Sequence, residues 1–163
     1  MKLNKYLPVM TMTALLMFSC SRDEISDPSD QSFLPDPPAA KIIEIETMQL
    51  INEYRISIGL QSLNNLGVIK SVAYSHTEYM LALNQLSHDN FEQRRRTLID
   101  NAGAITVSEN VGYGYTSGQA VLDAWLSSPS HRSIIEGNYT DFDISAEQNE
   151  IGVWFFTNIF IRK

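Results

Sequence analysis

Cysteine is nearly absent from this chain, which removes one common route to stability. The 163 residues contain a single cysteine, so no disulfide can form within the chain. Positive charge is also scarce: 12 Lys and Arg residues face 19 Asp and Glu residues, and the net charge is −7. An acidic surface argues against nucleic acid as a partner, because phosphates require a basic stripe. We therefore expect a domain that is held together by its hydrophobic core alone.

The N-terminus lacks an apolar run long enough to span a bilayer well. Two lysines, Lys2 and Lys5, precede an apolar stretch over residues 7–18, a pattern typical of a signal peptide over residues 1–19. Cys20 follows the small residue Ser19, and this placement resembles the cleavage site of bacterial lipoproteins. Cleavage there would leave 163 − 19 = 144 residues with a net charge of −7 − 2 = −9. Cys20 would then carry lipid; the alternative is ordinary secretion with a free thiol.

An acidic and proline-rich segment separates Cys20 from the rest of the chain. Residues 20–40 are rich in Asp, Ser and Pro, a composition that predicts a flexible tether. The acidic group in residues 21–24 is similar to signals that send some Gram-negative lipoproteins to the cell surface. We expect an exported protein that contacts the membrane through its lipid alone, in the outer membrane and exposed at the surface. Residues 41–163 are then a single domain.

Apolar spacing in this domain predicts helices first and strands last. Residues 41–60 and 66–83 show helical spacing, and further helices are expected in 91–103 and 118–128. A strand is expected in 104–115, and a short helix begins at Pro129 with Ser128 as its N-cap. Two runs in 143–163 are typical of a β-hairpin. This order predicts a layered α+β fold.

Three polar residues are candidates for a functional site. His88 follows the long second helix, Glu109 lies in the strand segment, and His131 is the third residue of the short helix. Two imidazoles and one carboxylate form the ligand set of an open zinc-type site and suit acid–base chemistry equally well. Their sequence separations of 21 and 22 residues do not show by themselves that the three side chains meet.

Other polar residues have structural interpretations. His76 lies on the apolar stripe of its helix, so we expect a core histidine that bonds to the backbone. Arg94, Arg95 and Arg96 cannot all face one way; we expect a solvated face, with one of them paired to a nearby acid. Asn110 follows Glu109 and is expected to brace its own loop through a backbone bond.

The motifs SENVG and W-x-x-SPSHR, followed by IGVWFFTNIFIRK, resemble those of the CAP superfamily, the SCP-like group of cysteine-rich secretory, antigen 5 and pathogenesis-related proteins. The likeness covers residues 41–163. It implies a three-layer α-β-α sandwich with a central, mainly antiparallel sheet. It also implies a cleft in which His88 and His131 are the two histidines and Glu109 is the glutamate. Ser128 stands where plant and animal members have a second acid, which weakens the case for tight metal binding. Ser128, Asn110 and Asn158 would support the cleft.

Several functions stay open at this point. The leading hypothesis is a non-enzymatic, monomeric binding module of the cell envelope, whose His88, Glu109 and His131 hold Zn²⁺ or another divalent cation. Its partner would be an envelope protein, a glycan or a lipid, and we assign no catalytic residue. One alternative is a hydrolase, a protease or esterase, that uses a serine of the 127–130 segment in the same cleft. Another is a lipid- or sterol-binding protein with an aromatic groove formed by Tyr113, Tyr115, Trp154, Phe155 and Phe156.

Overall fold

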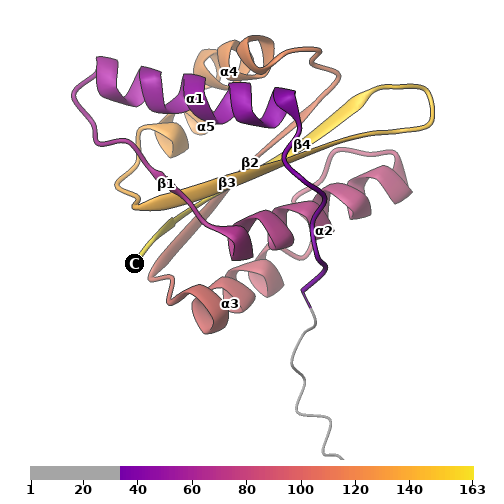
Figure 1. The fold of residues 1–163 in the computed structure, drawn as a ribbon, viewed down its shortest axis with the longest axis horizontal. Helices are drawn as coiled ribbons and strands as arrows, with labels where there is room; N and C mark the ends of the chain where they lie inside the picture. Colours follow the sequence, from indigo (N-terminus) through magenta and orange to yellow (C-terminus); the bar gives the residue numbers. More distant parts are fainter. Residues whose placement is uncertain (1–33) are drawn as a thin grey trace, which may run out of the picture. The chain divides into compact units, whose positions relative to one another are not determined.

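The structure, a computed structural model, describes residues 34–163 (Figure 1). The predicted signal peptide, Cys20 and most of the tether lie outside the described residues. The elements follow one another as α1 (Ile42–Ser57), β1 (Asn64–Asn65), α2 (Gly67–Leu83), α3 (Phe91–Ala102), β2 (Thr106–Tyr113), α4 (Gly118–Ser127), α5 (Pro129–Ile135), β3 (Asp141–Gln148) and β4 (Trp154–Arg162). None of the helices within residues 34–163 is both long and apolar enough to cross a membrane.

The four strands form one mixed sheet in the order β1-β3-β4-β2. Strand β4 is antiparallel to both of its neighbours, and only the two-residue strand β1 runs parallel to its partner, β3. The predicted hairpin is therefore confirmed as β3 and β4. Strand β1 was not predicted, because two exposed asparagines carry no alternating pattern.

Helices cover both faces of this sheet (Figure 1). Helices α1, α4 and α5 pack on one face around a core that includes Ile51, Trp125 and Phe142. Helices α2 and α3 pack on the other face around Ile69, Leu98 and other apolar residues. The predicted three-layer α-β-α sandwich with a mainly antiparallel sheet is confirmed.

Local signals explain where the helices begin and end. Gly59, with a φ of +82°, follows the end of α1 in the left-handed conformation that glycine tolerates best. The hydroxyl oxygen of Ser117 accepts a hydrogen bond from the Ala120 amide at 3.1 Å and caps α4. Pro129 occupies the first position of α5, as predicted.

A buried ion pair between Glu44 of α1 and Lys70 of α2 was not predicted. The Glu44 carboxylate also accepts hydrogen bonds from the amides of Lys41 at 2.7 Å and Ala146 at 2.6 Å. The Lys70 ammonium donates further to the Ile144 carbonyl at 2.8 Å. These bonds satisfy the buried charges and join α1, α2 and β3, so the pair fixes the arrangement of the layers.

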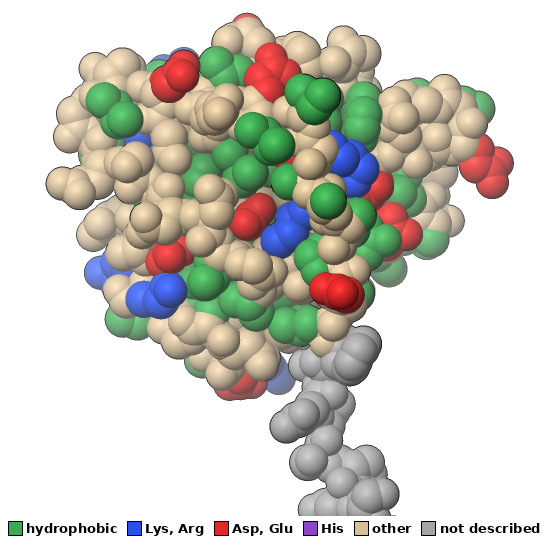
Figure 2. All heavy atoms as spheres, in the orientation of Figure 1, with side chains coloured by type: hydrophobic (Ala, Val, Ile, Leu, Met, Phe, Trp, Pro, Cys, Tyr) green, Lys and Arg blue, Asp and Glu red, His purple; other side chains and the backbone are tan. Residues whose placement is uncertain are grey.

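The aromatic residues of the last strand mostly fill the core. Phe155 and Phe156 are fully buried, whereas Tyr113 is 46% exposed. On the face of the molecule that Figure 2 shows, acidic and basic side chains are scattered among apolar ones, with no large area of a single charge. The alternative of an aromatic groove therefore does not hold for Phe155 and Phe156, whose side chains are buried in the core.

Candidate functional site

His88 and Glu109 are in direct contact. His88 lies in the loop after α2, and its Nδ1 is 2.8 Å from Oε1 of Glu109 in strand β2. The Glu109 side chain is only 1% exposed, whereas that of His88 is 53% exposed. A buried carboxylate therefore holds an imidazole whose other edge faces the solvent.

Arg94 locks this carboxylate in place from the opposite side. Its guanidinium donates from Nε to Oε2 of Glu109 and from Nη2 to Oε1, both at 2.7 Å. It also donates to the Asp89 carbonyl at 2.6 Å and to the His88 carbonyl at 3.4 Å. Arg94 thus ties α3 to β2 and to the loop that carries His88. All three arginines pair with an acid: Arg95 and Arg96 pair with Glu92 on the exposed face, as a solvated face predicts, whereas Arg94 pairs with Glu109 and is buried.

These contacts determine the charge state of the site. Burial favours the neutral form of Glu109, but hydrogen bonds from His88 and Arg94 outweigh it and hold the pKa of this carboxyl below its usual range. An ionised carboxylate only accepts hydrogen bonds, so the proton of the contact sits on Nδ1 of His88. In the neutral ring the lone pair is then on Nε2, the atom that can bind a metal or a proton.

His76 supports the same loop from inside the protein. It is 3% exposed, and its Nε2 is 2.8 Å from the Ser87 carbonyl, so Nε2 carries a proton and donates it. The same nitrogen is 3.8 Å from Oε1 of Glu109. Burial lowers the pKa of His76, which therefore stays neutral near pH 7. The prediction of a core histidine bonded to the backbone is confirmed.

His131 approaches the site from helix α5. Its backbone carbonyl accepts a hydrogen bond at 3.1 Å from Nδ2 of Asn110, the residue after Glu109 in β2. Burial lowers the pKa of the His131 ring, and the nearby His88 lowers it further. Two of the three histidines, His76 and His88, thus lie beside Glu109, and His131 lies near His88. A hollow of about 270 Å³ opens here, lined by His88, Phe91, Glu109, Ile134 and two β2 residues, Val107 and Ser108.

The predicted supporting residues have different roles. The prediction that Asn110 braces its own loop is wrong, because Asn110 lies within β2 and bonds to α5 instead. Asn158 pairs with Asn110 across the sheet, is fully buried, and donates to the Asp143 carbonyl at 2.8 Å. Ser128 occupies the N-cap position of α5, but its hydroxyl contacts Ser130 at 3.1 Å rather than a helix amide.

The serines near His131 do not form a nucleophile–base pair. The hydroxyl of Ser127 donates to the Asp123 carbonyl at 2.7 Å, and those of Ser128 and Ser130 contact each other. Glu109 orients His88 rather than His131. The hydrogen bonds of the described residues therefore do not link serine, histidine and carboxylate as a hydrolase relay requires.

The fit of a divalent metal was assessed from the donor atoms. Both oxygens of Glu109 already accept hydrogen bonds from Arg94, and one of them also binds His88. Residues 34–163 contain no group of three or more His, Cys, Asp or Glu side chains arranged to hold a metal. The predicted set of His88, Glu109 and His131 is therefore not assembled as a metal site: Glu109 orients His88 instead, and the imidazoles of His88 and His131 are the remaining candidate donors.

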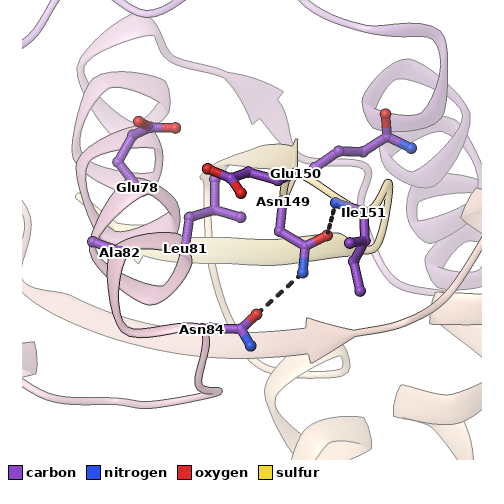
Figure 3. Close-up of a pocket in the computed structure, with 8 residues that line it drawn as sticks. Glu78, Leu81, Ala82, Asn84, Asn149, Glu150 and Ile151 are labelled. Atoms are coloured by element: carbon purple, nitrogen blue, oxygen red, sulfur yellow. Dashed lines mark hydrogen bonds between the residues drawn. The ribbon is translucent and has the colours of Figure 1, made fainter.

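A larger hollow of about 620 Å³ lies away from the histidines, between the end of α2 and the β3–β4 turn (Figure 3). Asn149 in the turn donates to Oδ1 of Asn84 at 3.1 Å and accepts from the Ile151 amide at 3.2 Å. The side chains of Glu78 and Glu150 also line this hollow. The amide contacts hold the turn against α2.

Comparison with known proteins identifies the family. Residues 48–157 match the cysteine-rich secretory protein family, CAP. The chain belongs to this family. The resemblance drawn from SENVG and SPSHR to this family is thus confirmed.

Three similar proteins set the domain in context. The uncharacterized membrane protein YlbC of Bacillus subtilis is 27% identical over 126 residues, which are 74% of this chain but 34% of YlbC. An extracellular protein with an SCP domain from Bacillus anthracis matches with a TM-score of 0.64 and 26% identity, over 74% of this chain and 40% of that chain. An outer surface protein of Borrelia burgdorferi has a TM-score of 0.64 and 19% identity, over 71% of this chain and 89% of that chain. The chain therefore spans about a third of the length of YlbC.

Proposed function

We propose that this CAP protein is an exported, lipid-anchored binding module of the cell envelope rather than an enzyme. The signal-peptide pattern and the position of Cys20 support export and anchoring. The names of its relatives, an outer surface protein, an extracellular protein and a membrane protein, agree with a place at or beyond the membrane. Palmitate labelling that is lost in Cys20→Ser would support the anchor, and equal labelling of both forms would contradict it.

The orientation of the His88 ring carries the binding proposal. Glu109 fixes Nδ1–H, Arg94 fixes Glu109, and the ring is left half exposed. A rigidly oriented imidazole loses little entropy when it binds a ligand, and carboxylate–histidine contacts of this kind raise the basicity of the other ring nitrogen. We infer that His88 and His131 together take a divalent cation such as Zn²⁺, which would offer open coordination positions to oxygen or nitrogen atoms of a partner.

Zinc titration of the exported protein by calorimetry tests this proposal. We expect saturable uptake of one ion and a large loss of affinity in His88→Ala and His131→Ala. Asp100→Asn, which removes an exposed carboxylate of α3, is the matched control and should leave the affinity unchanged. Absence of saturable uptake would exclude the metal, and identical affinity in His88→Ala would exclude this site for it.

A further inference from the structure

A second pocket lies behind the Arg94–Glu109 pair, between α2 and α3. It has a volume of about 270 Å³ and is separate from the hollow at His88. Its lining includes two buried side chains of the site network, His76 and Arg94. The remaining lining residues are Leu34, Pro35, Val72, Ser75, Tyr79, Asn90, Gln93 and Thr97.

The two buried residues each leave one polar group without a partner. His76 donates through Nε2, so its Nδ1 carries a lone pair, and no described residue donates to it. Arg94 has five N–H groups, of which one on Nη1 has no acceptor among the described residues. Both side chains are more than nine-tenths buried, at 3% and 8% exposed. Neither atom is among the fully buried side-chain atoms that lack a partner in the described residues, so Nδ1 of His76 reaches the surface of the pocket, where a ligand can bond to it.

The chemistry of these two groups selects the kind of ligand. One of them is an acceptor and the other is a donor, and a hydroxyl group can bond to both at once. An ammonium group could not accept from Arg94, and a carboxylate could not donate to His76. The charge of Arg94 is already neutralised by Glu109, so an ionic ligand gains no counterion in the pocket.

The walls extend this preference to several hydroxyls. Ser75, Asn90 and Gln93 contribute neutral side chains that make no hydrogen bond to other described residues. Val72 and Pro35 supply apolar surface on the same pocket, and the ring of Tyr79 is stacked on His76 with centroids 5.8 Å apart. Neutral donors and acceptors beside an aromatic ring suit the hydroxyls and the C–H face of a sugar.

We propose that this α2–α3 pocket binds a single neutral sugar residue of a glycan, with one hydroxyl bonded between His76 and Arg94. The inference rests on the proposed binding function and names a ligand class for it, at a site distinct from the metal cleft. The volume is close to the lower limit of about 300 Å³ for ligand pockets, which suits one ring rather than a long chain.

The three histidines make nuclear magnetic resonance a direct test. The exported protein, without added metal, is titrated with methyl glycosides of glucose, galactose, mannose and N-acetylglucosamine, and the imidazole signals are assigned with single histidine variants. Each glycoside has about a dozen or more non-hydrogen atoms, and for a ligand of this size we expect at least one of the four to bind with a Kd of about 1 mM. The largest shift is expected at His76, a smaller one at His88, and almost none at His131.

Variants then localise the binding. Gln93→Ala and Ser75→Ala change exposed helix positions and should each weaken binding about fivefold, the value of one neutral hydrogen bond. Gln49→Ala, the same kind of change on exposed α1, should have no effect. The proposal is overturned by the absence of saturable binding, by tighter binding of the charged analogues glucosamine or methyl glucuronide, or by shifts confined to Asn84 and Asn149 in the hollow of Figure 3. Zinc binding by the same protein is measured separately, and its outcome tests the metal proposal and not the sugar pocket.

Discussion

Removing one charge of the Arg94–Glu109 pair should destabilise the domain much more than removing both. Arg94 and Glu109 are 8% and 5% exposed, and two hydrogen bonds of 2.7 Å join them. Loss of a single partner leaves the other charge in the interior, which costs about 3–5 kcal/mol of unfolding free energy. A domain of this size has a total of about 5–15 kcal/mol, so either single variant would be close to unfolding.

Methionine at both positions gives the decisive comparison. Arg94→Met and Glu109→Met should each lose about 3–5 kcal/mol, whereas the double variant should lose no more than either single one, because no buried charge remains. Arg94 also bonds to two backbone carbonyls, so we expect the double variant to remain about 1–2 kcal/mol below the wild type. The exposed Arg95–Glu92 pair on the same helix is the control, and Arg95→Met should leave stability nearly unchanged.

Urea unfolding, followed by the fluorescence of the buried Trp125, measures these differences. The pH dependence is a second check. Because the folded pKa of Glu109 lies below its ordinary value of 4.5, its stabilising effect is present above pH 4.5 and is lost as the pH falls through the folded value. The gap between wild type and Glu109→Met should therefore narrow only in acid. Additive losses in the double variant at pH 7 would refute the pairing argument.

Two other variants test the buried charges and the layer contacts. Burial raises the pKa of Asp143 from 3.8 to about 6, so its ionised form destabilises the fold at pH 7. Asp143→Asn should therefore raise the free energy of unfolding in urea by at most about 3 kcal/mol at pH 7. This gain should fade as the pH falls from 6 to 3.8. A gain that persists below that range would contradict this cause. At Gly118 an added Cβ would lie 2.7 Å from the Thr47 amide nitrogen, so Gly118→Ala should cost about 1–3 kcal/mol. Gly67→Ala, with open space around it, should be neutral or stabilising, and equal thermal shifts for both would refute the contact.

Sequence patterns predicted the helices, the hairpin and the cap residues because these depend on local chemistry. The spacing of apolar residues placed α2, and Ser117 and Pro129 marked the starts of α4 and α5. The family motifs then indicated which loops carry His88, Glu109 and His131. None of these signals encodes which of two faces a charged residue takes, and the error at Arg94 came from that source.

The burial of Arg94 could have been predicted in part from the sequence. Within α3 the buried residues are Arg94 and Leu98, four positions apart, and Phe91 packs on the same core. This spacing of three and four places Arg94 on the inner stripe of the helix, a pattern that was available in the sequence. The charge of Arg94 favours an exposed position, and only the position of Glu109 opposite α3 explains why Arg94 is buried. The bonding partner of Asn110 was predicted wrongly for a related reason, because a side chain that bonds from a strand to a helix distant in the sequence leaves no local pattern.

The position of His88 on a loop would ordinarily make its ring mobile, yet the core holds this loop in several places. Nε2 of His76 binds the Ser87 carbonyl, Arg94 binds the next two carbonyls, and Glu109 binds the ring itself. Buried residues therefore determine the direction of the exposed Nε2 edge of His88. The direction of the His88 ring therefore depends on the Arg94–Glu109 pair, and a ligand behind this pair would act on the same imidazole from the other side.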